Sequence, residues 1–164
     1  KGYRTARENL KDLVDADSFI EYGQLAVAAQ RERLNPDELK LKSAADGVLT
    51  GLATINRCQH GEKASQVAVI INDYTAMAGT QGFFHHKKID RLIEIAKKLE
   101  LPVVMYTEGG GGRPGDIDVK TQIAGLDVPT FSSWAGLKGK NPLIVVNNGS
   151  VSYTHLTLPT SPKV

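Results

Sequence analysis

Apolar residues gather in four short runs along the chain, and these runs have the composition of β-strands. They cover residues 48–56, 66–72, 102–107 and 142–147. The run at 66–72 is almost continuously apolar and mostly β-branched, which is typical of a strand buried on both faces. The order strand, strand, helix, strand, loop, strand predicts an α/β fold with mainly buried strands.

The clearest helical pattern covers residues 80–100, where apolar residues recur every three or four positions. Its apolar stripe consists of Ile89, Leu92, Ile93, Ala96 and Leu99. The face that we expect to meet water consists of Lys88, Arg91, Glu94, Lys97 and Lys98. Thr80 is the expected N-cap.

The other segments have weaker patterns. Apolar positions between Ala6 and Val14 predict an N-terminal helix. Residues 26–34 are expected to form a short helix that stops before Asn35-Pro36, and residues 36–45 a charged loop. Residues 57–65 are expected to form a polar turn, whereas residues 119–124 and 129–140 fit no single element.

Composition and charge exclude several classes of function. A chain of 164 residues, 41% hydrophobic and 23% charged, suits one soluble globular domain. Its net charge of +2 is small and its charges are interleaved, so no nucleic-acid partner is expected. No apolar stretch approaches the ~20 residues of a membrane span, so no membrane association is expected. Cys58 is the only cysteine, which rules out an intrachain disulfide and fits a cytoplasmic location.

A glycine-rich segment, residues 108–116, follows directly on the third strand run. Three interpretations remain open. The segment is a flexible connection, or Gly110, Gly112 and Gly115 form the G-x-G-x-x-G pattern of dinucleotide-binding proteins with Pro114 in the turn. In the third, consecutive N–H groups form a concavity for an anion or an oxyanion. A Walker loop is excluded, because no Gly-Lys-Ser/Thr follows.

Short motifs also occur in a fixed order between residues 7 and 149. They are 13–22 (LVDADSFIEY), 46–51 (DGVLTG), 54–56 (TIN), 72–75 (NDYT), 79–82 (GTQG) with Lys87, 110–113 (GGGR), 142–144 (PLI) and 148–149 (NG). No single motif is specific. Their order and spacing resemble the N-terminal half of the carboxyltransferase component of biotin-dependent acyl-CoA carboxylases, the acetyl- and propionyl-CoA carboxylase group.

The resemblance implies a fold, a reaction and partners. The fold is the crotonase/ClpP-like ββα superhelix, incomplete here, with residues 1–149 forming part of the N-terminal domain. In that family, carboxybiotin carried on a partner domain gives its carboxyl group to the α-carbon of a short acyl-CoA, and no metal is implied in this domain. The implied partners are biotin carboxyl carrier and biotin carboxylase components, a second carboxyltransferase domain or subunit, and further copies in a homo-oligomer. Without that second domain, the chain is expected to be inactive alone.

The resemblance also implies site residues. Gly111 and Gly112 match the motif positions whose backbone N–H groups would hold the enolate oxygen. Arg113 is the motif arginine and is expected to brace the loop. The expected substrate-binding residues are Gly79, Thr80, Gly82, Lys87, Gly110 and Arg113. Residues 79–82 would lie near the pantetheine of CoA or simply form a helix-entry turn, and Lys87 would meet a phosphate or solvent.

The chain departs from the family pattern at several positions. Gly109 replaces the motif serine and Gly112 its alanine, so a more mobile loop is expected. His85-His86 stands where smaller or acidic residues are usual. His86 and Asp90 have the i,i+4 spacing of a metal-binding pair, but without a third ligand no metal site is expected.

Other functions and the two ends of the chain complete the expectations. A crotonase-fold hydratase would need paired glutamates, and of Asp73 and Glu108, which both follow strands, only Glu108 is well placed. An acyl-CoA decarboxylase and a non-catalytic CoA-binding or assembly module remain alternatives. Residues 150–164 resemble a translated sequencing adapter or are a genuine polar tail or edge strand, and the natural N-terminus is expected upstream, because residue 1 is not Met.

Overall fold

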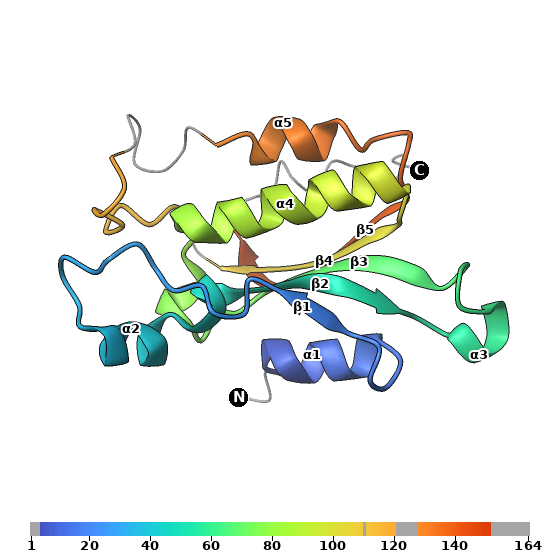
Figure 1. Ribbon diagram of the computed structural model, residues 1–164, viewed down its shortest axis with the longest axis horizontal. Coiled ribbons are helices and arrows are strands. Elements are labelled where there is room, and N and C mark those ends of the chain that lie inside the picture. The colour runs from blue at the N-terminus through green and yellow to red at the C-terminus, as the bar shows by residue number, and fades with distance from the viewer. Residues whose placement is uncertain (1–3, 110, 121–127, 152–164) are drawn as a thin grey trace.

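The computed structural model describes residues 4–109, 111–120 and 128–151 (Figure 1). Its described strands form one five-stranded sheet in the order β1-β2-β3-β4-β5. They are β1 (Ile20–Tyr22), β2 (Val48–Thr54), β3 (Gln66–Asn72), β4 (Val103–Gly109) and β5 (Leu143–Val151). β1, β2 and β3 are antiparallel neighbours, whereas β3, β4 and β5 run parallel. Because parallel neighbours need a crossover, helix α4 (Phe83–Leu99) connects β3 to β4.

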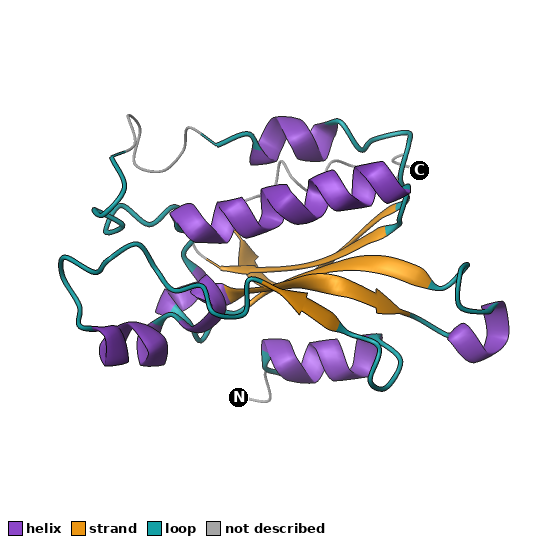
Figure 2. Ribbon diagram, viewed as in Figure 1, coloured by secondary structure: helices purple, strands orange, loops and turns teal. Residues whose placement is uncertain are grey.

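Helices cover both faces of the sheet (Figure 2). α4 and α5 (Thr130–Ala135) lie on one face, and α1 (Ala6–Leu13) lies on the other. Ile70 of β3 belongs to the core cluster that contains Ile93 of α4, and the next residue, Ile71, belongs to the cluster that contains Leu10 of α1. The sequence-based prediction that this strand is buried on both faces is therefore confirmed.

The remaining helical elements are short. They are α2 (Pro36–Lys42), α3 (Arg57–His60) and the 3₁₀ turns η1 (Ala44–Gly47) and η2 (Met77–Gly79). α3 occupies part of the segment that was expected to be a polar turn, and α5 occupies part of residues 129–140, for which no element was predicted. None of the described helices has both the length and the apolar character needed to cross a membrane.

All four predicted strands and the N-terminal helix are present, but two strands are longer than expected. β4 continues through Glu108 to Gly109, so these two residues belong to the sheet and not to the glycine loop. The extension has a partner, because Gly109 pairs with Val151 of β5. β5 in turn includes residues 150–151, which the sequence had assigned to the tail, while residues 152–164 lie outside the described residues.

The prediction for residues 26–45 was wrong in both halves. Residues 36–45 contain helix α2, whose N-cap Asn35 accepts hydrogen bonds at its Oδ1 from the amides of Asp37 (3.1 Å) and Glu38 (3.0 Å). Residues 26–34 form no helix. Their amides bond elsewhere instead, as the N–H of Ala28 does to Oγ of Ser43 at 3.0 Å. The amides of Arg31 and Glu32 likewise donate to a distant side chain, that of Asp118, whereas those of Arg33 and Leu34 form local turns.

α4 also differs from its predicted pattern. Lys88, expected to face water, is only 9% exposed, and its Nζ donates to the carbonyl oxygens of Ala45 (2.7 Å) and Val48 (2.5 Å). These carbonyls lie at a turn in which Ala45 and Asp46 have positive φ. Burial lowers the pKa of Lys88 to about 8. Leu99, placed in the apolar stripe, is 52% exposed.

Candidate active site

The loop that follows β3 and the glycine loop that follows β4 lie side by side at the carboxyl ends of these strands. They pair through a short parallel bridge between Gln81 and Gly112. The N–H of Gln81 donates to the carbonyl of Gly111, and the N–H of Arg113 donates to the carbonyl of Gln81, both at 2.8 Å. The carboxyl ends of parallel strands are the usual place for ligand sites in open α/β sheets.

The loop after β3 also touches the last residue of β4, main chain to main chain, at Gly79 and Gly109. A Cβ on Gly79 would lie 2.6 Å from Cα of Gly109, and a Cβ on Gly109 would overlap the carbonyl oxygen of Gly79. Both residues also have positive φ, 68° and 136°. The sequence-predicted substrate residue Gly79 is therefore needed to let the loops meet, and the Gly109 that replaces the family serine fits the same contact.

The glycine loop presents a backbone donor that has no acceptor among the described residues. In a parallel bridge with these hydrogen bonds, the N–H of Gly112 points away from Gln81. Gly112 is exposed, and no described residue accepts a hydrogen bond from its amide. Gly111 beside it has φ 82°, a conformation that favours glycine. Gly110 lies outside the described residues.

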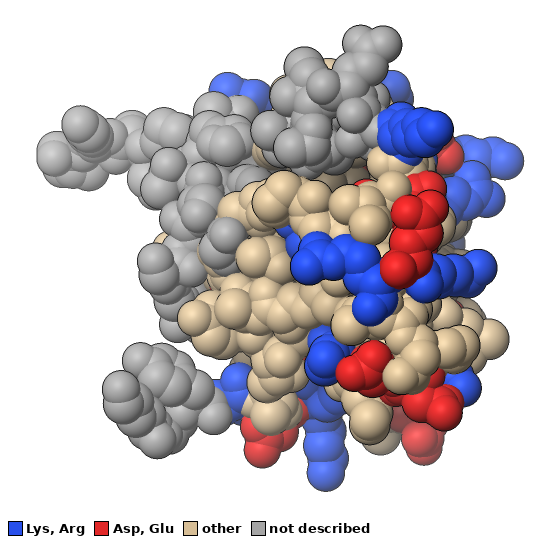
Figure 3. Space-filling model, turned by 90° about the vertical axis from the view of Figure 1, so that its left-hand side faces the viewer, with Lys and Arg blue, Asp and Glu red and all other residues tan. Residues whose placement is uncertain are grey.

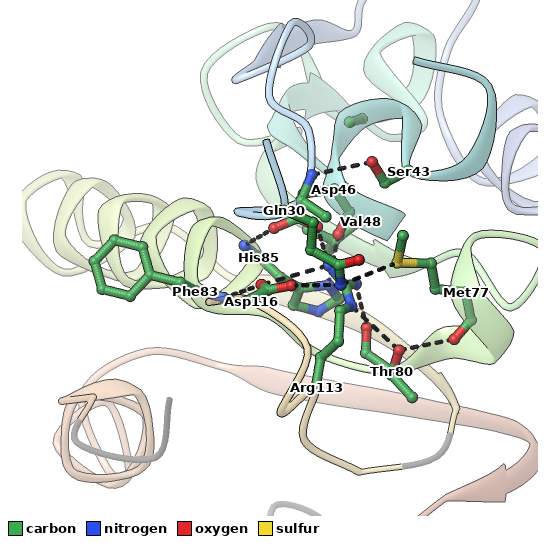
Figure 4. A network of polar contacts seen from close by, with 12 residues as sticks. Gln30, Ser43, Asp46, Val48, Met77, Thr80, Phe83, His85, Arg113 and Asp116 are labelled. Carbon is green, nitrogen blue, oxygen red and sulfur yellow. Dashed lines mark hydrogen bonds and ion pairs between the residues drawn. The ribbon is translucent and has the colours of Figure 1, made fainter. Parts of the chain in front are cut away.

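Arg113 joins the two loops to the turn before β2 (Figure 4). Its buried guanidinium forms an ion pair with Asp46 through Nη1. Nε donates to Oγ1 of Thr80 at 3.2 Å, and Nη2 donates to the carbonyl oxygen of Thr80 at 2.5 Å. The Asp116 carboxylate lies 3.7 Å from Nη1. The guanidinium is occupied by partners within the chain, which is the arrangement of a brace.

Carboxylates of the chain itself fill the N-terminus of α4. Asp116 Oδ2 accepts from the amide of Phe83 at 3.0 Å, and Asp46 Oδ2 accepts from the amide of His85 at 2.7 Å. The helix begins at Phe83 with Gly82 as N-cap, so the expected cap at Thr80 was wrong. Thr80 Oγ1 instead donates to the carbonyl of Met77 at 2.7 Å. The helix-entry interpretation of residues 79–82 accounts for these contacts without a ligand anion.

Asp46 is the most buried charge at the site, with none of its surface exposed. Burial raises the pKa of the Asp46 carboxyl, and the Arg113 guanidinium and the His85 amide oppose that rise. The Asp46 carbonyl also accepts from Nδ1 of His85 at 2.9 Å, which fixes the tautomer with a proton on Nδ1. Burial, followed by the nearby His86, lowers the pKa of His85 well below its ordinary value, so the ring is neutral at pH 7.

His86 and Asp90 both contact one hydroxyl group, that of Thr130. Thr130 of α5 donates from Oγ1 to Asp90 Oδ1 at 2.5 Å, and Nδ1 of His86 lies 3.1 Å from the same Oγ1. Burial lowers the pKa of His86 to about 4 and raises the pKa of Asp90. Within the described residues, no group of three or more His, Cys, Asp or Glu side chains is placed to hold a metal ion.

Two further candidates lie at the edges of the site. Lys87 is exposed on the first turn of α4, with Nζ 5.3 Å from the centroid of the Phe83 ring. Figure 3 views this end of the molecule, where Lys and Arg side chains are intermixed with Asp and Glu. Glu108 is partly buried, and burial followed by the neighbouring Asp73 raises its pKa. Asp73 accepts from the amide of Thr75 at 2.9 Å, as a turn residue does.

Sequence reasoning missed the segment around Gln30, which is hydrogen-bonded to Asp116 and Asp118 next to the glycine loop. Gln30 Nε2 donates to Asp116 Oδ1 at 3.0 Å. Asp118 accepts from the amides of Arg31 at 2.7 Å and Glu32 at 3.0 Å. These partners are more than 80 residues apart in sequence, so no local motif links them.

Comparison with known proteins identifies relatives of this fold and site. Residues 1–128 match the family model described as "Carboxyl transferase domain". The chain is 33% identical over 116 residues to a putative propionyl-CoA carboxylase beta chain of Bacillus subtilis (strain 168), covering 69% of this chain and 20% of the relative. It is 31% identical over 113 residues to the methylmalonyl-CoA decarboxylase subunit alpha of Veillonella parvula, again with 69% and 20% coverage. This chain therefore spans about a fifth of the length of these relatives.

Solved structures agree with the sequence relatives. A single-chain, multi-domain long-chain acyl-CoA carboxylase superposes with a TM-score of 0.81 and 51% identity, over 89% of this chain and 14% of that one. The transcarboxylase 12S structure, with methylmalonyl-CoA and methylmalonic acid bound, superposes with a TM-score of 0.70 and 28% identity, over 90% and 26%. The predicted crotonase-like fold class is confirmed by these neighbours. With its α/β sheet, its paired loops and more than half of its length matched by the family model, the chain belongs to the carboxyl transferase domain family.

Proposed function

We propose that this chain is part of a carboxyltransferase that moves a carboxyl group from carboxybiotin to the α-carbon of a short acyl-CoA, acetyl- or propionyl-CoA. The observation that carries the proposal is the backbone N–H of Gly112, which is exposed and has no acceptor among the described residues. A donor held at the carboxyl ends of parallel strands suits the oxygen of a thioester enolate. The family match and the acyl-CoA carboxylases among the relatives support this chemistry.

The chain's own contribution in this proposal is electrostatic. Carboxybiotin, when bound, supplies the carboxyl group, and the biotin left behind accepts the α-proton. As that proton leaves the acyl-CoA, negative charge moves onto the thioester oxygen, and the amides of Gly111 and Gly112 donate to it. The electron pair returns to the α-carbon to form its new bond to the carboxyl carbon, and the negative charge ends on the new carboxylate. Loss of one such donor typically raises a barrier by ~2.7–4 kcal/mol.

The remaining site residues have supporting roles in the proposal. Arg113 braces the loop, as its contacts to Asp46 and Thr80 support. Gly79 keeps the two loops in contact close to the pantetheine, and Gly110 completes the loop backbone. Lys87, exposed on α4, is assigned to a CoA phosphate.

The proposal also includes partners and a location. Biotin carboxyl carrier and biotin carboxylase components would deliver the carboxyl group, and a second carboxyltransferase domain or subunit would hold biotin against the glycine loop. The 164-residue chain alone would then lack half of its active site. A homo-oligomer is supported by the hexamer assembly described for transcarboxylase 12S, and a cytoplasmic location completes the proposal.

An acyl-CoA decarboxylase is the second candidate. The relative from Veillonella parvula, a methylmalonyl-CoA decarboxylase subunit alpha, favours it. Loss of carbon dioxide from a carboxylated acyl-CoA leaves the same enolate, so the Gly112 amide would serve both reactions. Complete protein incubated with methylmalonyl-CoA and free of biotin acceptor would separate the two, since only a decarboxylase would release carbon dioxide.

Isothermal titration calorimetry of the chain tests the proposal. Propionyl-CoA and acetyl-CoA are each titrated into the chain, and NADH is titrated as the ligand of the dinucleotide interpretation. We expect saturable binding of the acyl-CoA ligands and none of NADH. Absence of acyl-CoA binding at millimolar ligand would overturn the proposal, and NADH binding in its place would revive the dinucleotide interpretation of Gly110, Gly112 and Gly115.

A further inference from the structure

The carboxylate of Asp116 touches three segments that are far apart in the sequence. Its Oδ1 accepts from Gln30 Nε2 at 3.0 Å, and its Oδ2 accepts from the amide of Phe83, also at 3.0 Å. Oδ2 further lies 3.7 Å from Nη1 of Arg113, and the Asp116 side chain is only 5% exposed. Figure 4 shows Gln30, Phe83 and Arg113 converging on it. The glycine loop is thereby tied to α4 and to the segment around Gln30.

The loop needs such an anchor because its backbone is intrinsically free. Fixing the backbone of one residue costs roughly 1–2 kcal/mol of conformational entropy, and glycine loses the most. The sequence from Gly110 to Gly115 contains four glycines, so this cost is concentrated in the segment that carries the Gly112 amide. Charge-assisted hydrogen bonds to buried carboxylates are among the stronger contacts that offset it.

The charges around Asp116 are balanced for this task. Asp46 and Asp116 share the guanidinium of Arg113, and Lys88 also interacts electrostatically with Asp46. Both carboxylates face the first turn of α4, where Phe83 and His85 donate their amides and the helix dipole is positive. The amides of Phe83 and His85 at the N-terminus of α4 therefore already donate to carboxylates of the chain and are not open to an external anion.

Gly82 supplies the space for this contact. A Cβ on Gly82 would overlap Oδ2 of Asp116 and would lie 2.6 Å from Nη1 of Arg113. Gly82 does not have positive φ, so its backbone conformation does not itself require glycine. The side-chain-free surface of Gly82 is what lets the carboxylate reach the helix. This gives Gly82 a role in holding the loop, beside the substrate contact expected from the resemblance.

We propose that Asp116 is a positioning residue, which holds the glycine loop so that the Gly112 amide points at the substrate oxygen, with Gly82 and Gln30 completing the anchor. The role in catalysis rests on the function proposed above, whereas the anchoring of the loop does not. Asp116 acts through Arg113 and the loop backbone, and no contact with substrate is assigned to it.

Amide hydrogen exchange of the ¹⁵N-labelled 164-residue chain tests the anchor. The amides of Gln81 and Arg113, which form the bridge between the loops, are the reporters, and Val69 in the centre of β3 is the internal reference. In Asp116→Ala we expect both reporters to exchange at least about tenfold faster, with the reference unchanged, because only the loop opens locally. Asp37→Ala, at an exposed carboxylate on α2, is the control and should change neither.

Two further variants keep the test decisive if Asp116→Ala does not fold. Asp116→Asn keeps an acceptor of the same shape but loses the charge, so we expect a smaller acceleration at the same two amides. Gly82→Ala disrupts the contact of Asp116 with α4 from the helix side and should accelerate exchange of the same two amides. Unchanged exchange at Gln81 and Arg113 in these variants, or equal acceleration at Val69, would overturn the inference.

Binding of propionyl-CoA separates this inference from the proposed function. We expect Asp116→Asn to weaken propionyl-CoA binding about tenfold, because a loop that is ordered only part of the time binds less tightly. If the unmodified chain binds no acyl-CoA but shows the exchange pattern above, the function fails and the loop anchor stands. If the chain binds acyl-CoA and Asp116→Asn changes neither binding nor exchange, the anchor fails alone.

Discussion

Truncating Arg113 to alanine leaves Asp46 without its guanidinium in a place where none of its surface meets water. Asp116 loses the same neighbour, and both oxygens of Thr80 lose a donor. Removing one partner of a buried ion pair typically destabilises a protein by about 3–5 kcal/mol, because the remaining charge has no compensation. Against a typical domain stability of about 5–15 kcal/mol, the variant should be folded but weakened.

The destabilisation caused by Arg113→Ala should also depend on pH, which gives a more specific test. Burial already raises the pKa of Asp46, and loss of Arg113 removes an opposing influence, so the pKa rises further in the variant. A carboxyl with a raised pKa in the folded state binds its proton more tightly there than in the unfolded state. Its destabilising effect therefore appears as the pH rises through the folded pKa and disappears below the unfolded value. The difference between variant and unmodified chain should thus be larger at pH 8 than at pH 5.

Urea unfolding of both proteins at pH 5 and pH 8, followed by circular dichroism, measures these differences. Arg91→Ala is the matched control, since Arg91 is 69% exposed and pairs with Glu94 on the surface of α4. That control should cost at most about 1 kcal/mol at either pH. A penalty for Arg113→Ala no larger than that of Arg91→Ala, or one that grows on acidification, would refute the brace.

Three other outcomes are expected from the same unfolding assay. Acidification from pH 6.5 to pH 4 should lower the free energy of unfolding by up to about 3 kcal/mol through His86. The folded pKa of His86, about 4, lies below its unfolded value, so the unfolded chain gains the proton first. Replacing His86 by Asn should flatten this dependence of stability on pH. Gly79→Ala should destabilise more than Gly61→Ala, since both residues have positive φ but only the Cβ at Gly79 would meet backbone, at 2.6 Å from Gly109; equal losses would contradict the close contact. Asn35→Ala should cost about 0.5–2 kcal/mol by removing the cap of α2, and no loss would argue against that helix.

The strands could be predicted because their burial leaves a direct mark on the sequence. β3 has the predicted bounds, since both of its faces are covered and its run of apolar residues has no gap. Lys88 could not be placed in the same way. Its position on the helical pattern is polar, but a turn with positive φ at Ala45 and Asp46 brings two carbonyls within reach of its Nζ. The conformation that captures the lysine lies some 40 residues away in sequence.

Only those parts of the site whose residues are close together in the sequence could be predicted. The glycine run and its arginine mark the loop, and the resemblance assigns the loop its proposed role. The anchors Asp116 and Gln30 carry no sequence signal, because an aspartate after a glycine turn is usual in any loop. Their function depends on a contact across 86 positions, which only the folded sheet brings together. Residues 26–34 failed as a predicted helix for the same reason, since their polar groups serve the glycine loop.

The proposed role of the Gly112 amide can be tested at that amide itself. ¹H–¹⁵N spectra of the labelled chain are recorded while propionyl-CoA is added, with free CoA in a parallel titration. If the amide donates to the thioester oxygen, the Gly112 signal shifts saturably downfield with propionyl-CoA and much less with CoA, which lacks that oxygen. A Gly112 signal that stays in place while propionyl-CoA binds elsewhere on the chain would show that this amide does not hold the thioester oxygen.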